Sequence, residues 1–334
     1  MPEIFLSPSL QPFNPYVNGG NEAQIMGYLA DALEPYLTVN NIGYTRSRYP
    51  NTLANAISSS NAGNYDLHLA LHSNASPEAS SGRFRGVQAY YYPTSAQGKA
   101  AAQDLVEAMK TVYPDPDLVY TVPSTVITEV RRTKAPAVLM EIGYHDNLQD
   151  ADWIKANIQN IAQALAQGLT DYFNLPFFQV CATRGEVIAN SPQISTNAYV
   201  SVCTNDGSLL NIRSEPNLNS QILGQIPSGN KALLLERPNN AGWAKVRYNV
   251  IEGYASANFL CRCIPDTQAT TGVVTTDGGN LNLRSAPTLT SSIIGRIPNK
   301  TVITILETQG AWYKVNFMGA TGFVLSDFVK LQSR

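Results

Sequence analysis

The chain has 334 residues, of which 44% are hydrophobic and 14% are charged, and its formal net charge is −2 at pH 7. These values are ordinary for globular proteins and exclude a disordered or fibrous class, and the length allows two or three domains. The basic residues are scattered, so no nucleic acid is expected among the partners. No apolar run is long enough for a membrane span, and the opening MPEIFLSPSL lacks the basic start and apolar core of a signal peptide.

Residues 1–175 alternate short apolar runs with amphipathic helical patterns. Strands are predicted at Glu3–Leu6, Gly43–Arg46, Leu67–Leu71, Gly86–Tyr92, Val126–Val130 and Ala137–Glu141. Helices are predicted at Asn21–Leu37, Thr52–Ser60, Gln97–Tyr113 and Asp150–Tyr172. Strands that alternate with helices are typical of a layered α/β domain.

The segment DLHLALHSNAS, residues 66–76, contains two of the three histidines of the chain. Its leucines and histidines fall on opposite faces of a predicted strand. Positions four apart in a strand are separated by about 13 Å, so His68 and His72 cannot share one zinc ion, whose ligands lie about 2 Å away. His72 ends the strand, where sites of α/β sheets assemble, and is the candidate ligand. His68 lies deeper and is expected to be a hydrogen-bonded structural residue.

Two carboxylates also stand at the ends of predicted elements. Glu141 ends the apolar strand APAVLME, which would not carry a charge without a partner or a task. Glu22 lies in the first turn of a predicted helix, directly after the turn-forming VNGG. A first-turn acid commonly serves only the helix dipole, for about 0.3–1 kcal/mol, so Glu22 taken alone does not define a site.

From Tyr199 onwards the sequence changes to short strands and turns, and it contains an internal repeat. The stretch SLLNIRSEPNLNSQILGQIPSG at 208–229 matches GNLNLRSAPTLTSSIIGRIPNK at 279–300, and GWAKVRY later recurs as AWYKVNF. The second half is therefore predicted to be two copies of one β-domain of about 60 residues. We place these domains at 198–264 and 270–334, after a linker at 176–197.

All four cysteines, Cys181, Cys203, Cys261 and Cys263, lie outside the first half. The paired C-x-x-C units of a zinc knuckle are absent. One or two disulfides, or simple free thiols, are the remaining interpretations.

The repeats resemble the bacterial Src-homology-3 family, whose signature is a strand ending in LNVRSGPS, then a Gly, a Trp-containing strand and a G-Y-V turn. The matching residues are Leu210–Ser214 and Leu281–Ser285, Gly224 and Gly295, Trp243 and Trp312, and the pairs Gly253-Tyr254 and Gly322-Phe323. The resemblance implies small barrels that bind cell-wall peptide or glycan. The alternative is that the tryptophans and arginines only hold the barrels together.

The first half resembles the zinc-dependent N-acetylmuramoyl-L-alanine amidases of the amidase-3 family over residues 2–174. The motifs are a Glu that opens the first helix, the strand end HSNA, and R-x-T-x-x-P-A-V-L-x-E at 131–141. The resemblance implies a twisted, mostly parallel sheet with flanking helices. It implies zinc as cofactor, Glu22 and His72 as ligands, Glu141 as the catalytic carboxylate, and Arg131 near the substrate groove.

The resemblance also implies a substrate and a location. The substrate is peptidoglycan, both glycan and stem peptide, cut at the amide between N-acetylmuramic acid and L-alanine. The expected location is extracellular or associated with the cell wall.

One ligand of the family pattern is missing. The family's first zinc ligand is a His in a D-P-G-H-G-G turn, and Leu10 takes its place in an ungapped register. Three alternatives remain. His145 completes the site, Gln11 or a water in place of Gln11 completes it, or no tight zinc binds. His145 has a plain alternative as an exposed loop residue before the last helix. Loss of the ligand leaves open a catalytically weak or inactive, amidase-like protein that binds or regulates the wall.

Overall fold

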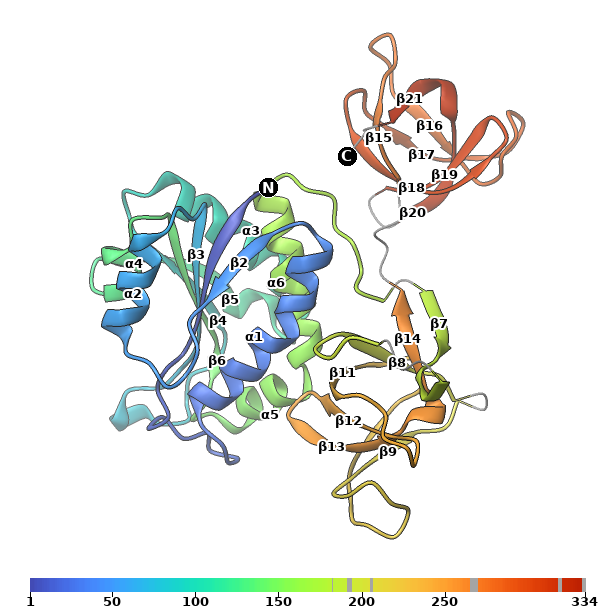
Figure 1. Ribbon diagram of the computed structural model, residues 1–334. Coiled ribbons are helices and arrows are strands. Elements are labelled where there is room, and N and C mark those ends of the chain that lie inside the picture. Colours follow the sequence, from blue (N-terminus) through green and yellow to red (C-terminus); the bar gives the residue numbers. More distant parts are fainter. Residues whose placement is uncertain (182, 191–193, 205–206, 265–269, 318–319, 332–334) are drawn as a thin grey trace. The chain divides into compact units, whose positions relative to one another are not determined.

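The structure is a computed structural model that describes residues 1–181, 183–190, 194–204, 207–264, 270–317 and 320–331 (Figure 1). The chain divides into two compact units, Met1–Pro265 and Asp266–Arg334. The first unit holds an α/β domain and one small β-domain, and the second unit holds the other β-domain. Within the described residues, no helix is long and apolar enough to cross a membrane.

The α/β domain is built on a six-stranded sheet in the order β2-β1-β3-β6-β4-β5. Its strands are β1 (Glu3–Pro8), β2 (Gly43–Arg46), β3 (Leu67–Asn74), β4 (Val87–Tyr91), β5 (Val119–Pro123) and β6 (Ala137–Tyr144). Neighbouring strands are parallel except at the antiparallel β4–β6 pair. The expectation of a mostly parallel sheet with flanking helices is confirmed.

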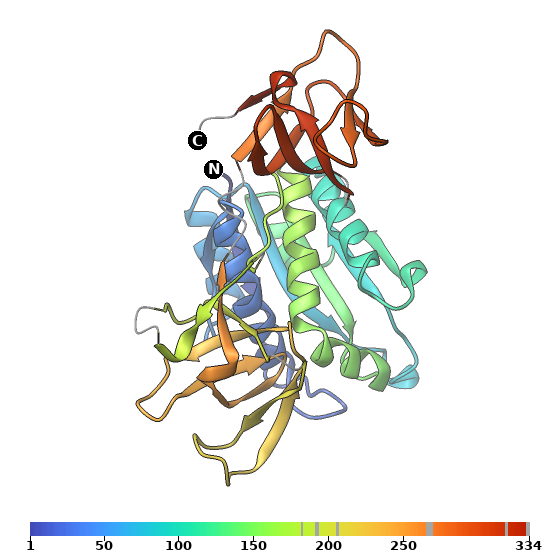
Figure 2. The same ribbon diagram turned by 90° about the vertical axis from the view of Figure 1, so that its right-hand side faces the viewer.

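Helices cover both faces of this sheet. They are α1 (Glu22–Val39), α2 (Leu53–Ala62), α3 (Ala96–Lys110), α4 (Thr128–Arg132), α5 (Leu148–Ala156) and α6 (Ile158–Tyr172), with short 3-10 helices at Glu78–Ser80 and Pro116–Leu118. Figure 1 shows α2 and α4 on one side and α1, α3 and α6 on the other, and Figure 2 shows α6 between α1 and α3. The leucines of β3 enter the main core under α1 and α6, while Ala70 lies in a smaller cluster with Val130 of α4.

Two predicted elements are wrong. The predicted strand Val126–Val130 is a loop followed by α4, and the strand of this region is β5, seven residues earlier. Ile127 and Val130 both pack in the smaller cluster, which is the three-residue spacing of a helical turn rather than strand alternation. The predicted helix Asp150–Tyr172 is two helices, because Asn157 leaves the helical conformation between α5 and α6.

The two β-domains have matching topologies. The first sheet has the order β10-β9-β13-β12-β11-β8-β14-β7, and the second has the order β17-β16-β20-β19-β18-β15-β21. The first set of strands is β7 (Thr183–Val187), β8 (Tyr199–Val202), β9 (Leu210–Arg213), β10 (Ile222–Ile226), β11 (Lys231–Glu236), β12 (Trp243–Tyr248), β13 (Ile251–Ser256) and β14 (Leu260–Ile264). The second set is β15 (Thr270–Val274), β16 (Leu281–Arg284), β17 (Ile293–Ile297), β18 (Val302–Gln309), β19 (Trp312–Phe317), β20 (Ala320–Leu325) and β21 (Val329–Leu331). Short 3-10 helices lie at Ile188–Asn190, Ala257–Phe259 and Ser326–Phe328.

The repeated arginines brace a loop in each β-domain. Arg213 Nη1 donates to the carbonyl of Ser220 at 2.8 Å, and Arg284 Nη1 donates to the carbonyl of Ser291 at 2.7 Å. Both bonds span seven residues and close the same turn of the repeat. The alternative that these arginines hold the domain together therefore has direct structural support.

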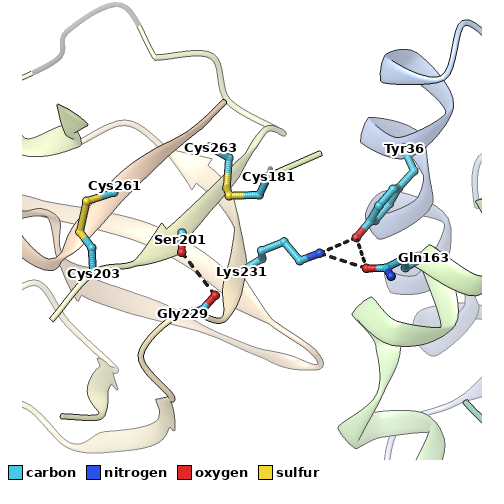
Figure 3. The surroundings of a disulfide bond; sticks show 9 residues. All are labelled: Tyr36, Gln163, Cys181, Ser201, Cys203, Gly229, Lys231, Cys261 and Cys263. Atoms are coloured by element: carbon cyan, nitrogen blue, oxygen red, sulfur yellow. Dashed lines mark hydrogen bonds between the residues drawn. A yellow bond between two sulfur atoms is a disulfide. The ribbon is translucent and has the colours of Figure 1, made fainter. Parts of the chain in front are cut away.

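The four cysteines form two disulfides, which confirms the disulfide alternative of the sequence analysis over free thiols. Cys181 pairs with Cys263, and Cys203 pairs with Cys261 (Figure 3). Both bonds end on β14. The first ties the segment after α6 to the first β-domain, and the second ties β14 to the loop that follows β8.

The first β-domain contacts helix α1 of the α/β domain. Lys231 Nζ donates to Tyr36 Oη at 2.7 Å and to Gln163 Oε1 at 3.2 Å (Figure 3). Arg247 forms an ion pair with Asp31, and its guanidinium lies 4.2 Å from the centre of the Tyr28 ring. These contacts join residues between 68 and about two hundred positions apart, so they depend on the tertiary structure alone.

Lys231 makes the stability of this contact depend on pH. Burial lowers the pKa of Lys231 to about 8, against about 10.4 for an unfolded lysine. The folded state therefore binds fewer protons between these two values, so the free energy of unfolding rises with pH across that window. Between pH 7.5 and 9.5, the free energy of unfolding of wild type should rise by about 2 kcal/mol more than that of Lys231→Met, as measured by urea unfolding.

Lys110→Met removes an exposed lysine and serves as the control, with no such pH trend expected. A wild-type-to-Lys231→Met difference that stays constant across this range contradicts the buried position of the ammonium group.

Candidate active site

The register of β3 and β6 brings two candidate residues together. His72 and Glu141 are direct partners in this parallel ladder. Residues at the same register on neighbouring strands present their side chains on the same face, about 5 Å apart. His72 belongs to the face with His68 and Ala70, away from the leucines that fill the main core. The strand pairing therefore places an imidazole and a carboxyl side by side at one edge of the sheet.

Helix α1 delivers the third residue. The segment after β1 loops back through a bridge between Pro15 and Asn21, and the side chain of Asn21 caps the helix by accepting from Gln24 N. Glu22 is thereby fixed at the first position of α1, where it is only 1% exposed. Its Oε1 lies 2.9 Å from His72 Nδ1. The convergence that the family pattern implied for these two residues is present in the structure.

Glu22 is held as an anion by its neighbours. Asn14 Nδ2 donates to its Oε2 at 2.6 Å, and the backbone N–H of Ser73 donates to its Oε1 at 3.3 Å. Burial alone would raise the pKa of Glu22, but the hydrogen bonds and charge of His72 and the bond from Asn14 outweigh it and lower the pKa. A carboxylate kept ionised in a buried position suits the binding of a cation.

His72 lies between carboxylates on both sides of its ring. Its Nε2 is 3.6 Å from Glu129 Oε2, opposite the side that faces Glu22. Burial lowers the pKa of His72, but the contacts with Glu129 and Glu22 and the charge of Glu141 prevail and raise it to about 10. These carboxylates therefore favour the protonated imidazole, and a metal that binds His72 would have to displace that proton.

Glu141 differs from these carboxylates in the state of one buried oxygen. Its Oε2 is buried and has no hydrogen-bond partner among the described residues. Burial, helped by the charge of Glu22 and opposed by that of His72, raises the pKa of Glu141 to about 7. A carboxyl with a near-neutral pKa can both accept and return a proton at neutral pH.

Glu129 is a site residue that sequence reasoning missed. It is buried on α4 and accepts hydrogen bonds from Ser7 Oγ and from His68 Nε2, the latter at 2.9 Å. Burial raises the pKa of Glu129, but the bonds from His68 and His72 hold it well below the usual range. The signal was present in VITEV, an apolar run with one carboxylate, which is the same signal that singled out Glu141. The wrong strand assignment for this run hid it.

His68 has the structural role that the sequence predicted. It is fully buried, and its Nδ1 lies 2.9 Å from Ser60 Oγ while its Nε2 faces Glu129. Its ring stacks on Phe5. Because both ring nitrogens are engaged, His68 supports Glu129 from behind the site.

His145 and Arg131 lie at the margin of this cluster. His145 is 5% exposed, so the alternative of an exposed loop residue is wrong. Its Nδ1 donates to the carbonyl of Ser73 at 2.8 Å, and its ring stacks on Tyr16. Arg131 is exposed on α4. Neither residue is among the described residues that line the cleft over His72.

That cleft has a volume of about 500 Å³ and runs over the ends of β1, β3 and β6. Gln11, His72, Glu129 and Glu141 line it, and the exposed Phe13 stands at its wall. The cleft is therefore mostly apolar with a few convergent polar groups at its base, which is the usual character of a small-molecule site.

We tested whether this donor set fits a zinc ion. Across the described parts of the chain, no three His, Cys, Asp or Glu side chains form a group that could hold a metal. Two ligands of a tetrahedral zinc lie about 3.4 Å apart. Glu22 and His72 approach this spacing at 2.9 Å, and the Gln11 side-chain amide meets it, with Nε2 3.3 Å from His72 Nδ1. Rotation of that amide would present its oxygen, so the set fits zinc only if Gln11 supplies the third donor.

Two regions of the chain are similar to known proteins. The sequence profile of the N-acetylmuramoyl-L-alanine amidase family, amidase-3, matches residues 14–171, and that of the bacterial SH3 domain matches residues 208–260 and 279–330. The Bacillus subtilis (strain 168) protein YrvJ, which bears the name of an N-acetylmuramoyl-L-alanine amidase, is 23% identical over 159 residues. The match covers 44% of this chain and only 30% of that protein.

Two solved structures are among those that match part of this chain. The N-acetylmuramoyl-L-alanine amidase AmiC2 of Nostoc punctiforme is 17% identical, covering 52% of this chain and 97% of that one, with a TM-score of 0.46. The catalytic domain of the CD27L endolysin targeting Clostridia difficile is 21% identical, covering 51% and 98%, with a TM-score of 0.45. On the sequence profiles alone, residues 14–171 are a domain of the N-acetylmuramoyl-L-alanine amidase family, and residues 208–260 and 279–330 are bacterial SH3 domains.

Proposed function

We propose that the protein hydrolyses the amide between N-acetylmuramic acid and L-alanine in peptidoglycan, with zinc as cofactor. The family match of residues 14–171 supports the reaction class. The observation that carries the proposal is the convergence of Glu22 and Glu141 on His72, with His72 and Glu141 in direct register and both lining one cleft. Three elements distant in sequence contribute to it, which a purely structural role does not require.

Glu22 and His72 would hold the metal, with the Gln11 amide as the third donor. When bound, zinc supplies a Lewis acid that polarises the scissile carbonyl and lowers the pKa of water. Gln11 is preferred to His145 because Gln11 lines the cleft with its side-chain amide 3.3 Å from His72 Nδ1, whereas His145 is not among the described residues that line it. A neutral amide binds zinc more weakly than imidazole does, so the affinity should be modest.

Glu141 would act as general base and then as general acid. Its buried Oε2 has no hydrogen-bond partner among the residues that the structure describes, and a pKa of about 7 would let the carboxyl accept the proton of the attacking water. The same carboxyl would return that proton to the nitrogen of L-alanine, since an amide nitrogen leaves poorly unless protonated. Hydrolysis separates the stem peptide from the glycan.

The SH3 domains would hold the enzyme at its polymeric substrate. Weak wall-binding modules raise the local concentration of a linked catalytic domain when the linkers reach. The two disulfides are typical of proteins exposed to an oxidising environment, which supports action outside the cytoplasm or at the cell wall. Arg131 remains a proposed substrate contact at the rim.

A second candidate function is an amidase-like wall-binding or regulatory protein with little or no activity. Leu10, in the place of the family's first histidine ligand, favours it. The buried Oε2 of Glu141, which has no partner in the described part of the chain, and the near-neutral pKa of this carboxyl favour the enzyme, because an inactive site gains nothing from burying such a group.

Elemental analysis and an assay for new amino termini released from purified peptidoglycan separate the two functions. We expect wild type to bind one zinc and to release amino termini, and His72→Ala to lose both. Gln11→Leu should weaken zinc binding, and Gln11→His should tighten it, because imidazole is the better donor. If the wild-type protein binds no zinc and releases no amino termini, the proposed hydrolase function is wrong and the second candidate, an amidase-like protein without activity, is supported.

A further inference from the structure

A second cleft adjoins the catalytic one. It has a volume of about 580 Å³, and Pro8 and Ser9 line both clefts. The chain after β2 forms another shared wall, since Arg48 and Tyr49 line the second cleft while Asn51 and the residues after it line the first. The two clefts therefore lie next to each other, and the end of β1 and the chain after β2 contribute to the walls of both.

Arg46 is a largely buried cation in the lining of the second cleft. Arg46 lines it with a side chain that is 7% exposed. Its Nη1 contacts Asp31 and Glu34 and its Nη2 donates to the Gly27 carbonyl, but its buried Nε has no partner in the described chain. The ion pairs with Asp31 and Glu34 hold this guanidinium in place at the wall of the cleft.

The charges around this cleft are balanced. The cations are Arg46, Arg48 and Arg247, and the anions that pair with them are Asp31, Glu34 and Glu252. An anionic stem peptide gains no net attraction from such a set. A neutral ligand with many hydroxyl or carbonyl oxygens still finds guanidinium and amide donors there.

The apolar part of the cleft is flat. Tyr49 is 58% exposed at its edge, and Tyr28 lines it with its ring against the guanidinium of Arg247. Pro8 and Pro12 complete the lining. Flat aromatic and proline surfaces beside planar polar groups suit the C–H faces and hydroxyls of pyranose rings.

We propose that this second cleft binds the glycan strand of peptidoglycan next to the sugar whose amide is cut. The inference rests on the proposed function, since it takes the scissile amide to lie over His72 and Glu141. Arg247 comes from β12, so the first SH3 domain helps to build the cleft by fixing Tyr28 and Asp31. The protein should therefore prefer long glycan strands to a substrate with a single sugar.

The test uses the full chain with Glu141→Gln, which isolates binding from hydrolysis. Isothermal titration calorimetry measures binding of chitotetraose, a neutral glycan without stem peptide, and of the free peptide L-Ala-D-isoGln-L-Lys-D-Ala. We expect chitotetraose to bind and Tyr49→Ala to weaken that binding about tenfold, the effect of losing one stacked ring. Phe84→Ala, which removes a ring exposed by 49% outside the residues that line either cleft, should leave it unchanged.

In the catalytically intact protein, Tyr49→Ala should lower kcat/KM about tenfold more on polymeric peptidoglycan than on muramyl dipeptide, which has one sugar. Binding of the free peptide but not of chitotetraose would assign the cleft to the stem peptide and overturn the proposal. An unchanged chitotetraose affinity in Tyr49→Ala would also overturn it. Because calorimetry needs no turnover, a protein that binds glycan but hydrolyses nothing would refute the proposed function separately.

Discussion

Glu141→Gln is expected to lower kcat for release of amino termini from peptidoglycan by a factor of about 10²–10⁴, the usual contribution of a general acid–base residue. The substitution keeps the size of the side chain but removes the group that accepts and returns the proton. Zinc content and the free energy of unfolding should change little, because Oε2 of Glu141 makes no hydrogen bond that would be lost among the described residues. Steady-state kinetics and elemental analysis on one preparation measure both.

His68→Gln is an instructive comparison, because His68 lies behind the site and contacts Glu129 rather than the substrate. Its effect should appear mainly in stability. If Glu141→Gln instead retains wild-type kcat, the assignment of Glu141 as the proton carrier fails, whatever the zinc content.

Glu129→Ala is expected to lower the free energy of unfolding by about 3 kcal/mol, as measured by urea denaturation. The change leaves the buried donors of Ser7 and His68 without an acceptor, and each such group costs about 1–3 kcal/mol. It also removes the carboxylate on the far side of His72. Loss of a group that orients a metal-binding histidine typically weakens metal affinity about 10–100-fold.

Glu129→Gln separates these two effects. It retains an oxygen that can accept from Ser7 while removing the negative charge that faces His72. Zinc affinity measured by competition with a chelator should therefore fall further than stability does. Equal zinc affinity in wild type and both variants contradicts a positioning role for Glu129 and leaves it a residue of the fold alone.

The sequence determined the parts of this protein that depend on local patterning. Alternation of leucine and histidine in 66–76 identified β3 and separated the roles of its two histidines, because strand geometry puts them too far apart for one ion. The repeat at 208–229 and 279–300 identified both SH3 domains, whose arginines and turns recur at fixed spacing. The sequence left open whether the cysteines form disulfides or remain free thiols.

The failures of prediction have a common cause. The run VITEV satisfies the alternation of a strand as well as the spacing of a single helical turn, and only packing of Ile127 and Val130 on Ala70 decides between them. With that run misassigned, Glu129 could not be placed near His72. The break at Asn157 was hidden in the same way, because the apolar stripe continues in phase across it.

Only the tertiary structure decided which groups meet. The register of β3 against β6 sets His72 beside Glu141, and the loop that returns from β1 sets Gln11 and Glu22 against the same imidazole. The pairing of the four cysteines and the contact of Arg247 with α1 arise likewise between segments far apart in the chain. Sequence patterns report the environment of each residue along its own element, whereas these encounters depend on how separate elements pack, which no local pattern encodes.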